Sequence, residues 1–287
     1  MRKNLALLAL LLFAGAVRPA AAASCTIASV TPVVFGTYSG MTEAVSSTLT
    51  IQCTSGLAYN IGLSAGTAGG ATVYSRAMIG PSATLGYGLF SDAGHSVIWG
   101  NSSGTGWVSG TGTGATQQVI IYAQIPSGEN VAAGSYSDTV TVTLSGNFST
   151  ATVQFNVSAT VLKACTVSAT PLAFGGYSGV LLSSTATIST TCTLGTAYSV
   201  GLDAGRSSGA TVTNRAMTGP SPSLMRYNLF RDAGYSSNWG NTPGADTVAG
   251  TGSGVVQYLT VFGQVPAAQP NLKAGSYNDT VTVTVTY

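Results

Sequence analysis

Four cysteines are the residues of this chain whose spacing most directly predicts a covalent bond. They form two pairs at similar separations, Cys25 with Cys53 and Cys165 with Cys192. An even number of cysteines in an exported chain indicates disulfides made in an oxidising compartment. Each half of the chain carries one pair, which favours pairing within the halves over pairing across them. The spacings do not match a zinc site, and a single histidine disfavours metal chemistry.

The other reactive side chains form no recognisable catalytic set. His95 is the only histidine, and a triad built around it would lack a nucleophile-elbow motif. We interpret His95 as an exposed turn residue. The glycine-rich segment 110–114 has no following lysine and no helix, which favours a turn over a phosphate-binding loop. Asp138 and Asp279 are expected to fix turns through bonds to the backbone. We therefore expect no enzyme, cofactor or metal; a secreted glycan hydrolase is the enzymatic alternative.

Residues 1–23 read as a secretory signal peptide. Arg2 and Lys3 form its charged start, an apolar stretch covers 5–17, and small residues at 21–23 supply the cleavage site. The apolar stretch is short for a membrane span. A cysteine just after a signal peptide can be a lipidation site, but Cys25 has a counterpart deep in the chain at Cys165. A structural role shared by both is therefore the better interpretation.

The charge balance excludes one class of partner. Loss of Arg2, Lys3 and Arg18 with the signal leaves seven basic against eight acidic side chains, so no basic patch for nucleic acid is expected. Only 6% of the residues are charged and 37 are glycine. Such a weakly charged surface suits a protein that assembles or adheres.

The chain repeats itself once. The cysteine pairs, a Phe-Gly, an Arg-Ala-Met, a Trp-Gly-Asn, a Gly-Thr-Gly and an Asp-Thr-Val-Thr-Val-Thr run recur in the same order. The number of residues between matching positions of the two copies is nearly constant. It is almost the same for Cys25 and Cys165, near the start of the repeat, as for Asp138 and Asp279, near its end. A period of this size indicates tandem homologous domains rather than a solenoid. We assign residues 24–161 to the first domain and 162–287 to the second.

Alternation with period two predicts an all-β fold. Segments 47–53, 59–63, 119–123, 139–143, 259–263 and 280–286 are rich in β-branched or aromatic residues and are bounded by turn-forming residues. About seven such strands per repeat indicate two tandem immunoglobulin-like β-sandwich domains. The disulfide of each repeat would join the first strand to the next one. A Thr-Pro after that cysteine fits an edge or a strand that changes sheets.

The two repeats differ at their ends. The first continues into a further strand over 152–161, in which Val153, Phe155, Val157, Ala159 and Val161 alternate with polar residues. The second ends at Tyr287 and lacks this final strand. Its last strand would then be an open acceptor edge, with Val281, Val283, Val285 and Tyr287 on it. Such a groove predicts completion by a strand from another chain. No donor segment precedes Cys25, so we expect the protein to accept a strand without giving one, and to terminate a fibre.

The ordered motifs resemble the spore coat protein U domain over essentially the whole mature chain. They include Cys25-Thr-Ile, the Thr-Pro-Val-Val-Phe-Gly run, Trp99-Gly-Asn, Gln-Ile-Pro and Ala-Gly-Ser-Tyr-Ser-Asp. The resemblance implies incomplete immunoglobulin-like pilin domains of archaic chaperone–usher pili or spore coats. It also implies a periplasmic chaperone, an outer-membrane usher and the N-terminal strand of an adjoining pilin as partners. Two-domain members resemble tip adhesins, which implies a surface-exposed protein of fimbriae and biofilms. The alternative is a coat protein without a specific receptor.

An adhesive surface would be built from residues of the first repeat that have no counterpart in the second. Apolar side chains are added in two Gly/Ser-rich stretches, at Tyr74, Ile79, Val97, Ile98 and Trp107. Exposed apolar loops often mark interaction sites, so we expect these residues to contact a hydrophobic or host surface. Packing in the core or against the second domain is the competing interpretation. Trp99 and Trp239 occur in both repeats and are expected in the cores.

Overall fold

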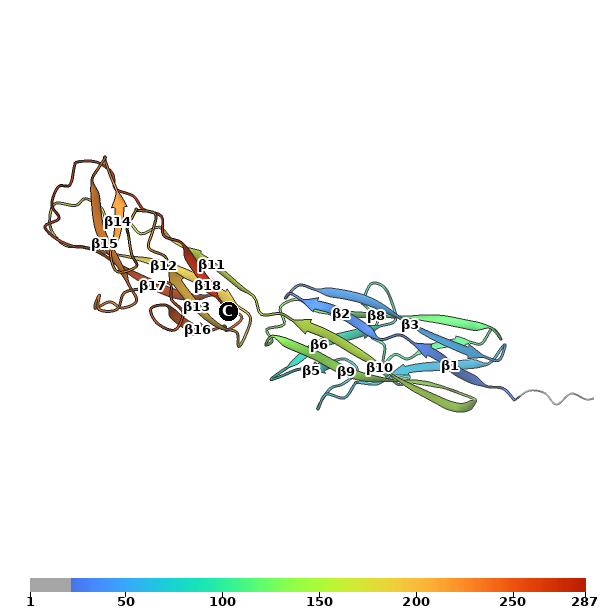
Figure 1. The fold of residues 1–287 in the computed structure, drawn as a ribbon. Helices are drawn as coiled ribbons and strands as arrows, with labels where there is room; N and C mark the ends of the chain where they lie inside the picture. Colours follow the sequence, from blue (N-terminus) through green and yellow to red (C-terminus); the bar gives the residue numbers. More distant parts are fainter. Residues whose placement is uncertain (1–21) are drawn as a thin grey trace, which may run out of the picture.

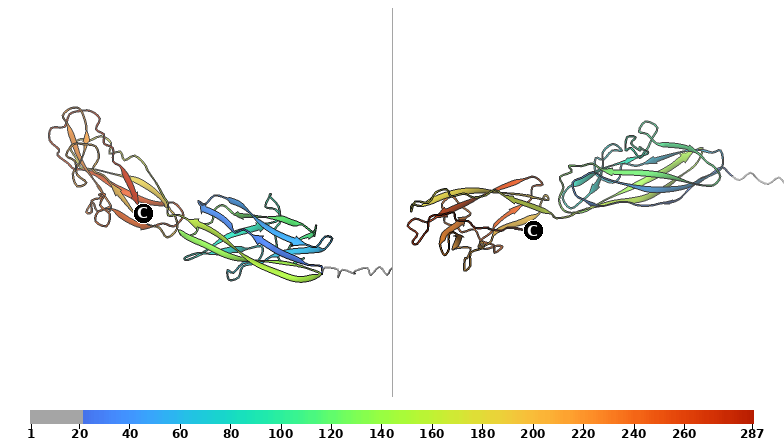
Figure 2. Two further views of the ribbon diagram at one scale, coloured as in Figure 1. Left: turned by 45° about the vertical axis from the view of Figure 1, so that its right-hand side comes forward. Right: turned by 90° about the horizontal axis from the view of Figure 1, so that it is seen from above.

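A computed structural model describes residues 22–287, so the predicted signal peptide lies outside the described residues apart from its last two positions. The described chain forms two elongated β domains that lie end to end (Figures 1 and 2). The predicted all-β class with two tandem domains is confirmed. Within residues 22–287, no helix is long and apolar enough to cross a membrane.

The first domain begins at the chain's described start and ends at Val161. Its strands are β1 (Cys25–Val30), β2 (Val33–Tyr38), β3 (Glu43–Cys53), β4 (Ala58–Leu63), β5 (Arg76–Ile79), β6 (Thr84–Phe90), β7 (Val108–Thr111), β8 (Thr116–Ile125), β9 (Gly134–Gly146) and β10 (Phe148–Val161). One sheet has the order β1-β3-β8-β6, and the other has β7-β4-β9-β10-β2. The short β5 bridges the two between β6 and β9. The core lies between the sheets.

The second domain begins at β11, and the three residues 162–164 join it to β10. Its strands are β11 (Cys165–Ala169), β12 (Leu182–Cys192), β13 (Ala197–Leu202), β14 (Arg215–Thr218), β15 (Leu224–Phe230), β16 (Val248–Thr251), β17 (Gln257–Val265) and β18 (Val283–Thr286). One sheet has the order β11-β12-β17-β15-β14, and the other has only β16-β13-β18. The prediction of about seven strands per repeat is thus low for both domains as described, because short strands such as β5 and β14 carry little sequence signal.

The second domain lacks more than one strand relative to the first. Residues 171–177 correspond to β2 but form no strand, and residues 279–282 correspond to the middle of β9 but form none either. The predicted strand over 280–286 was therefore wrong in its first half, since only Val283–Thr286 is a strand. In the first domain β10 lies between β9 and β2 and pairs with both. Without a strand in that place, β18 pairs only with β13, and residues 171–177 pair with no strand.

Both predicted disulfides are present, Cys25–Cys53 and Cys165–Cys192. The first joins β1 to β3 rather than to the next strand, because Thr31-Pro32 turns the chain out of one sheet and into the other as β2. This is the strand switch that the Thr-Pro motif predicts.

A tryptophan and an arginine anchor the core of each domain. Trp99 and Trp239 are 0% and 1% exposed, as predicted. Arg76 is buried beside Trp99 and donates to the carbonyls of Ser64, Val73, Leu63 and Trp99. Arg215 makes the equivalent four bonds in the second domain. A buried cation is tolerated here because its donors are paired with carbonyl oxygens. Burial still lowers the pKa of Arg76, to about 10.

Candidate functional site: a strand-acceptor groove

The first domain shows how a final strand completes this fold. β10 runs antiparallel to β9, with Phe155 opposite Val140 and Val161 opposite Gly134. On its other side β10 runs parallel to β2, with Val157 opposite Val33. One strand therefore supplies hydrogen-bond partners to two others and closes the sheet between them.

The alternation predicted from the sequence places the apolar side chains of β10 in the core. Phe155 is 4% exposed and Val157 is 0% exposed, whereas the intervening Asn156 is exposed. Ala159 and Val161 are also buried, and Val153 packs against the same core. Fully burying such a side chain stabilises a fold by about 1.5–3 kcal/mol. β10 is thus an integral part of the first domain.

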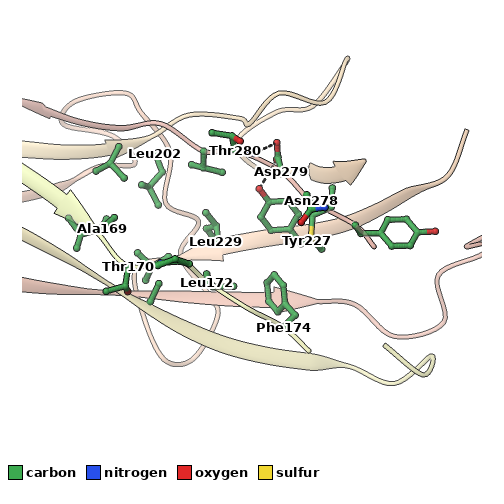
Figure 3. A pocket seen from close by; sticks show the side chains of 18 residues that line it. Ala169, Thr170, Leu172, Phe174, Leu202, Tyr227, Leu229, Asn278, Asp279 and Thr280 are labelled. Carbon is green, nitrogen blue, oxygen red and sulfur yellow. Dashed lines mark hydrogen bonds between the residues drawn. The ribbon is translucent and has the colours of Figure 1, made fainter. Parts of the chain in front are cut away.

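The corresponding place in the second domain is an open groove. A cavity of about 510 Å³ lies there, and its walls are mainly apolar. Leu172 and Phe174 come from the segment that corresponds to β2, Val281 and Val283 come from the last segment, and Leu229 lies on the floor (Figure 3). A second cavity of about 620 Å³ shares Leu172, Phe174, Met217, Tyr277 and Asn278 with the first and continues the groove away from the first domain.

Matched positions in the two domains show what the groove lacks. Residues buried beneath β10 become partly exposed in the second domain. The pairs are Val33 and Leu172, Phe35 and Phe174, Tyr38 and Tyr177, Tyr136 and Tyr277, Asp138 and Asp279, Val140 and Val281, Val142 and Val283, and Leu144 and Val285. The changes lie mainly on the walls. The floor residues Leu202 and Leu229 stay buried. The groove therefore lies where β10 lies in the first domain and has room for one strand.

Of the predicted acceptor-edge residues, three line or support this groove. Val281 and Val283 line it, and Val285 packs against the same core. Tyr287 lies beyond β18 and is exposed. The opposite wall, formed by Leu172, Phe174 and Tyr177, was missed at the sequence level. The Thr-Pro and Phe-Gly motifs shared with β2 of the first repeat were the signal that could have found it.

One polar network lies at the wall of the groove. The Asp279 carboxylate accepts hydrogen bonds from Tyr227 Oη at 2.7 Å, from the Arg206 N–H at 2.8 Å and from the Thr280 N–H. Asp138 likewise accepts bonds from Tyr87 and from the N–H of Thr67. Each aspartate thus accepts a main-chain hydrogen bond from a distant turn, as the predicted bonds to the backbone require. Burial, with the hydrogen bond to Asp279, raises the pKa of Tyr227.

The five candidate adhesive residues are not equally exposed. Tyr74 is 62%, Val97 is 52% and Ile79 is 49% exposed, while Ile98 and Trp107 are half-buried. Ile79 lies opposite Ser137, close to the end of the first domain that faces the second. The other end is built from the turns β3–β4, β7–β8 and β9–β10, none of which contains a candidate. The candidates therefore do not gather at the free end.

His95 is in a turn, as predicted, but it is not fully exposed. Its ring packs edge-on against Phe90 and Tyr122, and in the second domain Tyr235 takes the same place between Phe230 and Phe262. Both residues have positive φ values, 53° and 55°. The role is structural packing on an outer sheet face. Within residues 22–287 there is no cluster of three or more potential metal-ligating His, Cys, Asp or Glu side chains.

The family of the chain follows from comparison with known sequences. The family model of the Spore Coat Protein U domain matches residues 11–143 and again 151–284, which is most of the chain. The protein belongs to this family and carries two tandem copies of its domain. A curated relative, Protein U of Myxococcus xanthus, is 35% identical over 119 residues. That match covers 39% of this chain and 66% of the relative, so it spans just under two thirds of the relative's length.

One solved structure shares the architecture. A chain of the CsuC–CsuE chaperone–tip adhesion subunit pre-assembly complex from the Csu pili of Acinetobacter baumannii aligns with a TM-score of 0.51. The alignment covers 92% of this chain and 100% of that chain at 17% identity, and so shows a common fold. The CupB6 tip adhesin of Pseudomonas aeruginosa aligns over 92% of this chain and 94% of its own length, with a TM-score of 0.39 and 13% identity. The chain thus has the fold of chaperone–usher pilus subunits.

Proposed function

We propose that this protein is an exported pilus subunit whose second domain is completed by the N-terminal strand of an adjoining pilin. The observation that carries the proposal is the matched pair of domains, one with β10 in place and one with an empty groove of the same shape. Main-chain hydrogen bonds would give affinity, and alternate apolar side chains would fill the groove. An unpaired edge over an apolar cavity would otherwise promote aggregation.

The register of β10 defines the strand that fits. By equivalence with the first domain, a large apolar side chain lies opposite Val281, a branched one opposite Asp279 and a small one opposite Tyr277. These are the places of Phe155, Val157 and Ala159 in β10. The strand runs antiparallel to the last segment of the domain and parallel to residues 172–177. Before assembly, a periplasmic chaperone would cover the same groove, and an outer-membrane usher would direct the exchange.

The first domain would be the distal, adhesive part of a fibre tip that supports surface attachment and biofilm formation. It is complete through its own β10, and it lies end to end with the second domain along the molecule (Figure 1). The exposed Tyr74 and Val97, which lie on its flank, remain candidates for contact with a hydrophobic or host surface. Similarity of the fold to a chain of a chaperone–tip adhesion subunit complex supports this proposal.

Thermal unfolding of the mature chain with a synthetic peptide of residues 148–162 tests the groove. A ligand that binds only the folded domain stabilises it by about 2.7 kcal/mol at one hundred times its Kd. We expect the peptide to raise the melting temperature of the second domain alone. A matched peptide with Phe155→Asp and Val157→Asp should have no effect. Equal effects of the two peptides, or no response to either, would contradict the proposal.

A coat protein that polymerises without a specific receptor is the second candidate. The family description and the absence of the candidate residues from the free end of the first domain favour it. The two candidates predict the same groove and differ at the first domain. Surface binding that depends on Tyr74 and Val97 would support an adhesin, whereas assembly without such binding would support a coat protein.

A further inference from the structure

The ends of the two domains that lie opposite their disulfides have the same construction. In the first domain the Gly128 N–H donates to the Gly40 carbonyl, and Tyr38 Oη bridges the Pro126 carbonyl and the Glu129 N–H. In the second domain the same bonds join Ala268 to Gly179, and Tyr177 Oη to Pro266 and Gln269. The second domain therefore keeps this frame although its groove is open. We call these paired turns the base of each domain.

The base of the first domain is in contact with the second domain. Asn130 Nδ2 donates a 3.0 Å hydrogen bond to the carbonyl of Ser253, which lies in the Gly-Ser-Gly turn between β16 and β17. The linker is held as well, because Thr193 Oγ1 donates to the Leu162 carbonyl and accepts from the Ala164 N–H, each at 3.1 Å. A cavity of about 410 Å³ remains between the two surfaces. One side-chain hydrogen bond between the domains and the bonds that hold the linker therefore set how the two domains are oriented.

The turn that receives Asn130 belongs to the repeated fold. In the second domain the Gly254 N–H donates to the Cys192 carbonyl, and in the first the Gly114 N–H donates to the Cys53 carbonyl. A Gly-x-Gly turn beside the disulfide is thus present at the same end of both domains. A further domain of this family would present the same turn.

The base of the second domain carries an asparagine at the corresponding place. Asn130 directly follows Glu129 in the first domain. In the second domain Pro270 lies between Gln269 and Asn271 and lengthens the turn by one residue. The main chain of Asn271 accepts a hydrogen bond from Ser223 Oγ, which fixes its position, and its side chain is exposed. The next residue, Leu272, packs against the core as Val131 does in the first domain. The base of the second domain therefore presents an exposed amide on a main chain that a hydrogen bond holds, although Asn271 has a positive φ of 61° and Asn130 does not.

We propose that the base of the second domain docks on the disulfide-end turn of the next subunit, with Asn271 donating to a carbonyl of its Gly-x-Gly turn. This inference rests on the proposed strand exchange, which would bring the next subunit to this end. In the first domain β10 leaves the sheet at Val161, opposite Tyr38 of the base, and Cys165 of the following domain comes four residues later. A donor strand in the groove with the same short linker places its own domain against Asn271.

The chain supplies a neighbour of known sequence for the test. We would fuse a second copy of residues 145–287 directly after Val285 of the full chain. This junction is chosen because Val285 occupies the place of Leu144, the residue that precedes 145 in the first domain. The added copy then provides a turn, a strand for the groove, the linker and a third domain. Spin labels on the domains report the distance distribution at each joint by pulsed electron paramagnetic resonance, and thermal unfolding reports whether the groove is filled.

We expect a higher melting temperature for the second domain and a narrow distance distribution at the new joint. Asn271→Ala should widen that distribution at least twofold without lowering the melting temperature, and Asn130→Ala should widen only the original joint. A distribution at the new joint that is broad, or that Asn271→Ala does not change, would overturn the docking proposal while a raised melting temperature still supports strand exchange. An unchanged melting temperature would overturn both.

Discussion

Tyr227 donates a 2.7 Å hydrogen bond to Asp279 on the wall of the open groove, and Tyr87 donates to Asp138 at the same distance beneath β10. The two pairs are chemically identical but differ in their surroundings. Asp138 is 3% exposed, because β10 covers it with Val157 opposite, whereas Asp279 is partly exposed. Strand insertion into the groove would bury the second pair as β10 buries the first.

The loss of the tyrosine hydroxyl should therefore be felt differently in the two domains. Leaving a buried acceptor without one of its partners costs about 1–3 kcal/mol. We expect Tyr87→Phe to destabilise the first domain by an amount in this range, and Tyr227→Phe to cost the second domain less, because water can reach Asp279. Denaturant unfolding of both variants measures this difference. The difference should shrink when the 148–162 peptide fills the groove, and a constant difference would contradict burial of Asp279 by a strand.

Removal of a buried side chain from β10 should destabilise the first domain and leave the second domain unchanged. Phe155→Ala removes a buried ring between the sheets, and changes of this kind typically cost about 3–5 kcal/mol. The exposed neighbour provides the control, since Asn156→Ala should change stability by no more than about 0.5 kcal/mol. Calorimetry that resolves the two domain transitions measures both. Equal shifts for the two variants would show that β10 does not complete the core.

The sequence predicted what depends on local pattern. The cysteine pairs, the buried Trp99 and Trp239, and the alternating residues of β10 were all legible because each signal lies within one repeat or one strand. The first half of the predicted strand 280–286 was wrong because residues 280–282 have no strand beside them like the β10 that pairs with their counterparts in the first domain. The partial burial of Trp107 and the position of Ile79 near the second domain depend on tertiary packing, which no local sequence pattern encodes.

Adhesion, if the first domain carries it, should depend on the exposed candidates. Tyr74→Ser and Val97→Ser together should lower binding to a hydrophobic surface, while changing the free energy of unfolding by no more than about 0.5 kcal/mol per site. Met41 is 68% exposed on a turn at the base of the first domain, so Met41→Ser is a matched control. A quartz crystal microbalance measures the bound mass. An equal loss with Met41→Ser would indicate general hydrophobicity rather than a defined surface.

Acid should loosen the turn that presents Val97. Hydrogen bonds from the Val97 N–H at 2.7 Å and from Ser96 hold the pKa of Asp92 below its ordinary value of 3.8. A carboxyl whose pKa is lowered by folding stabilises the fold above the pKa of the unfolded chain, and this contribution is lost as pH falls through the folded pKa. We therefore expect the Val97 amide resonance to move as the pH is lowered below about 4, the ordinary range of an aspartate.

Asp92→Asn provides the control for this titration, because an amide keeps an acceptor at the turn but does not ionise in this range. The Val97 resonance of the variant should not follow the same transition. Asp232 makes the equivalent bonds to Ser236 and Ser237, and its pKa is lowered for the same reason, so the Ser237 amide should titrate in parallel. A Val97 amide that moves identically in the variant would mean that another group controls the turn. If surface binding by the first domain uses Val97, it should weaken over the same pH interval in the natural sequence and not in Asp92→Asn.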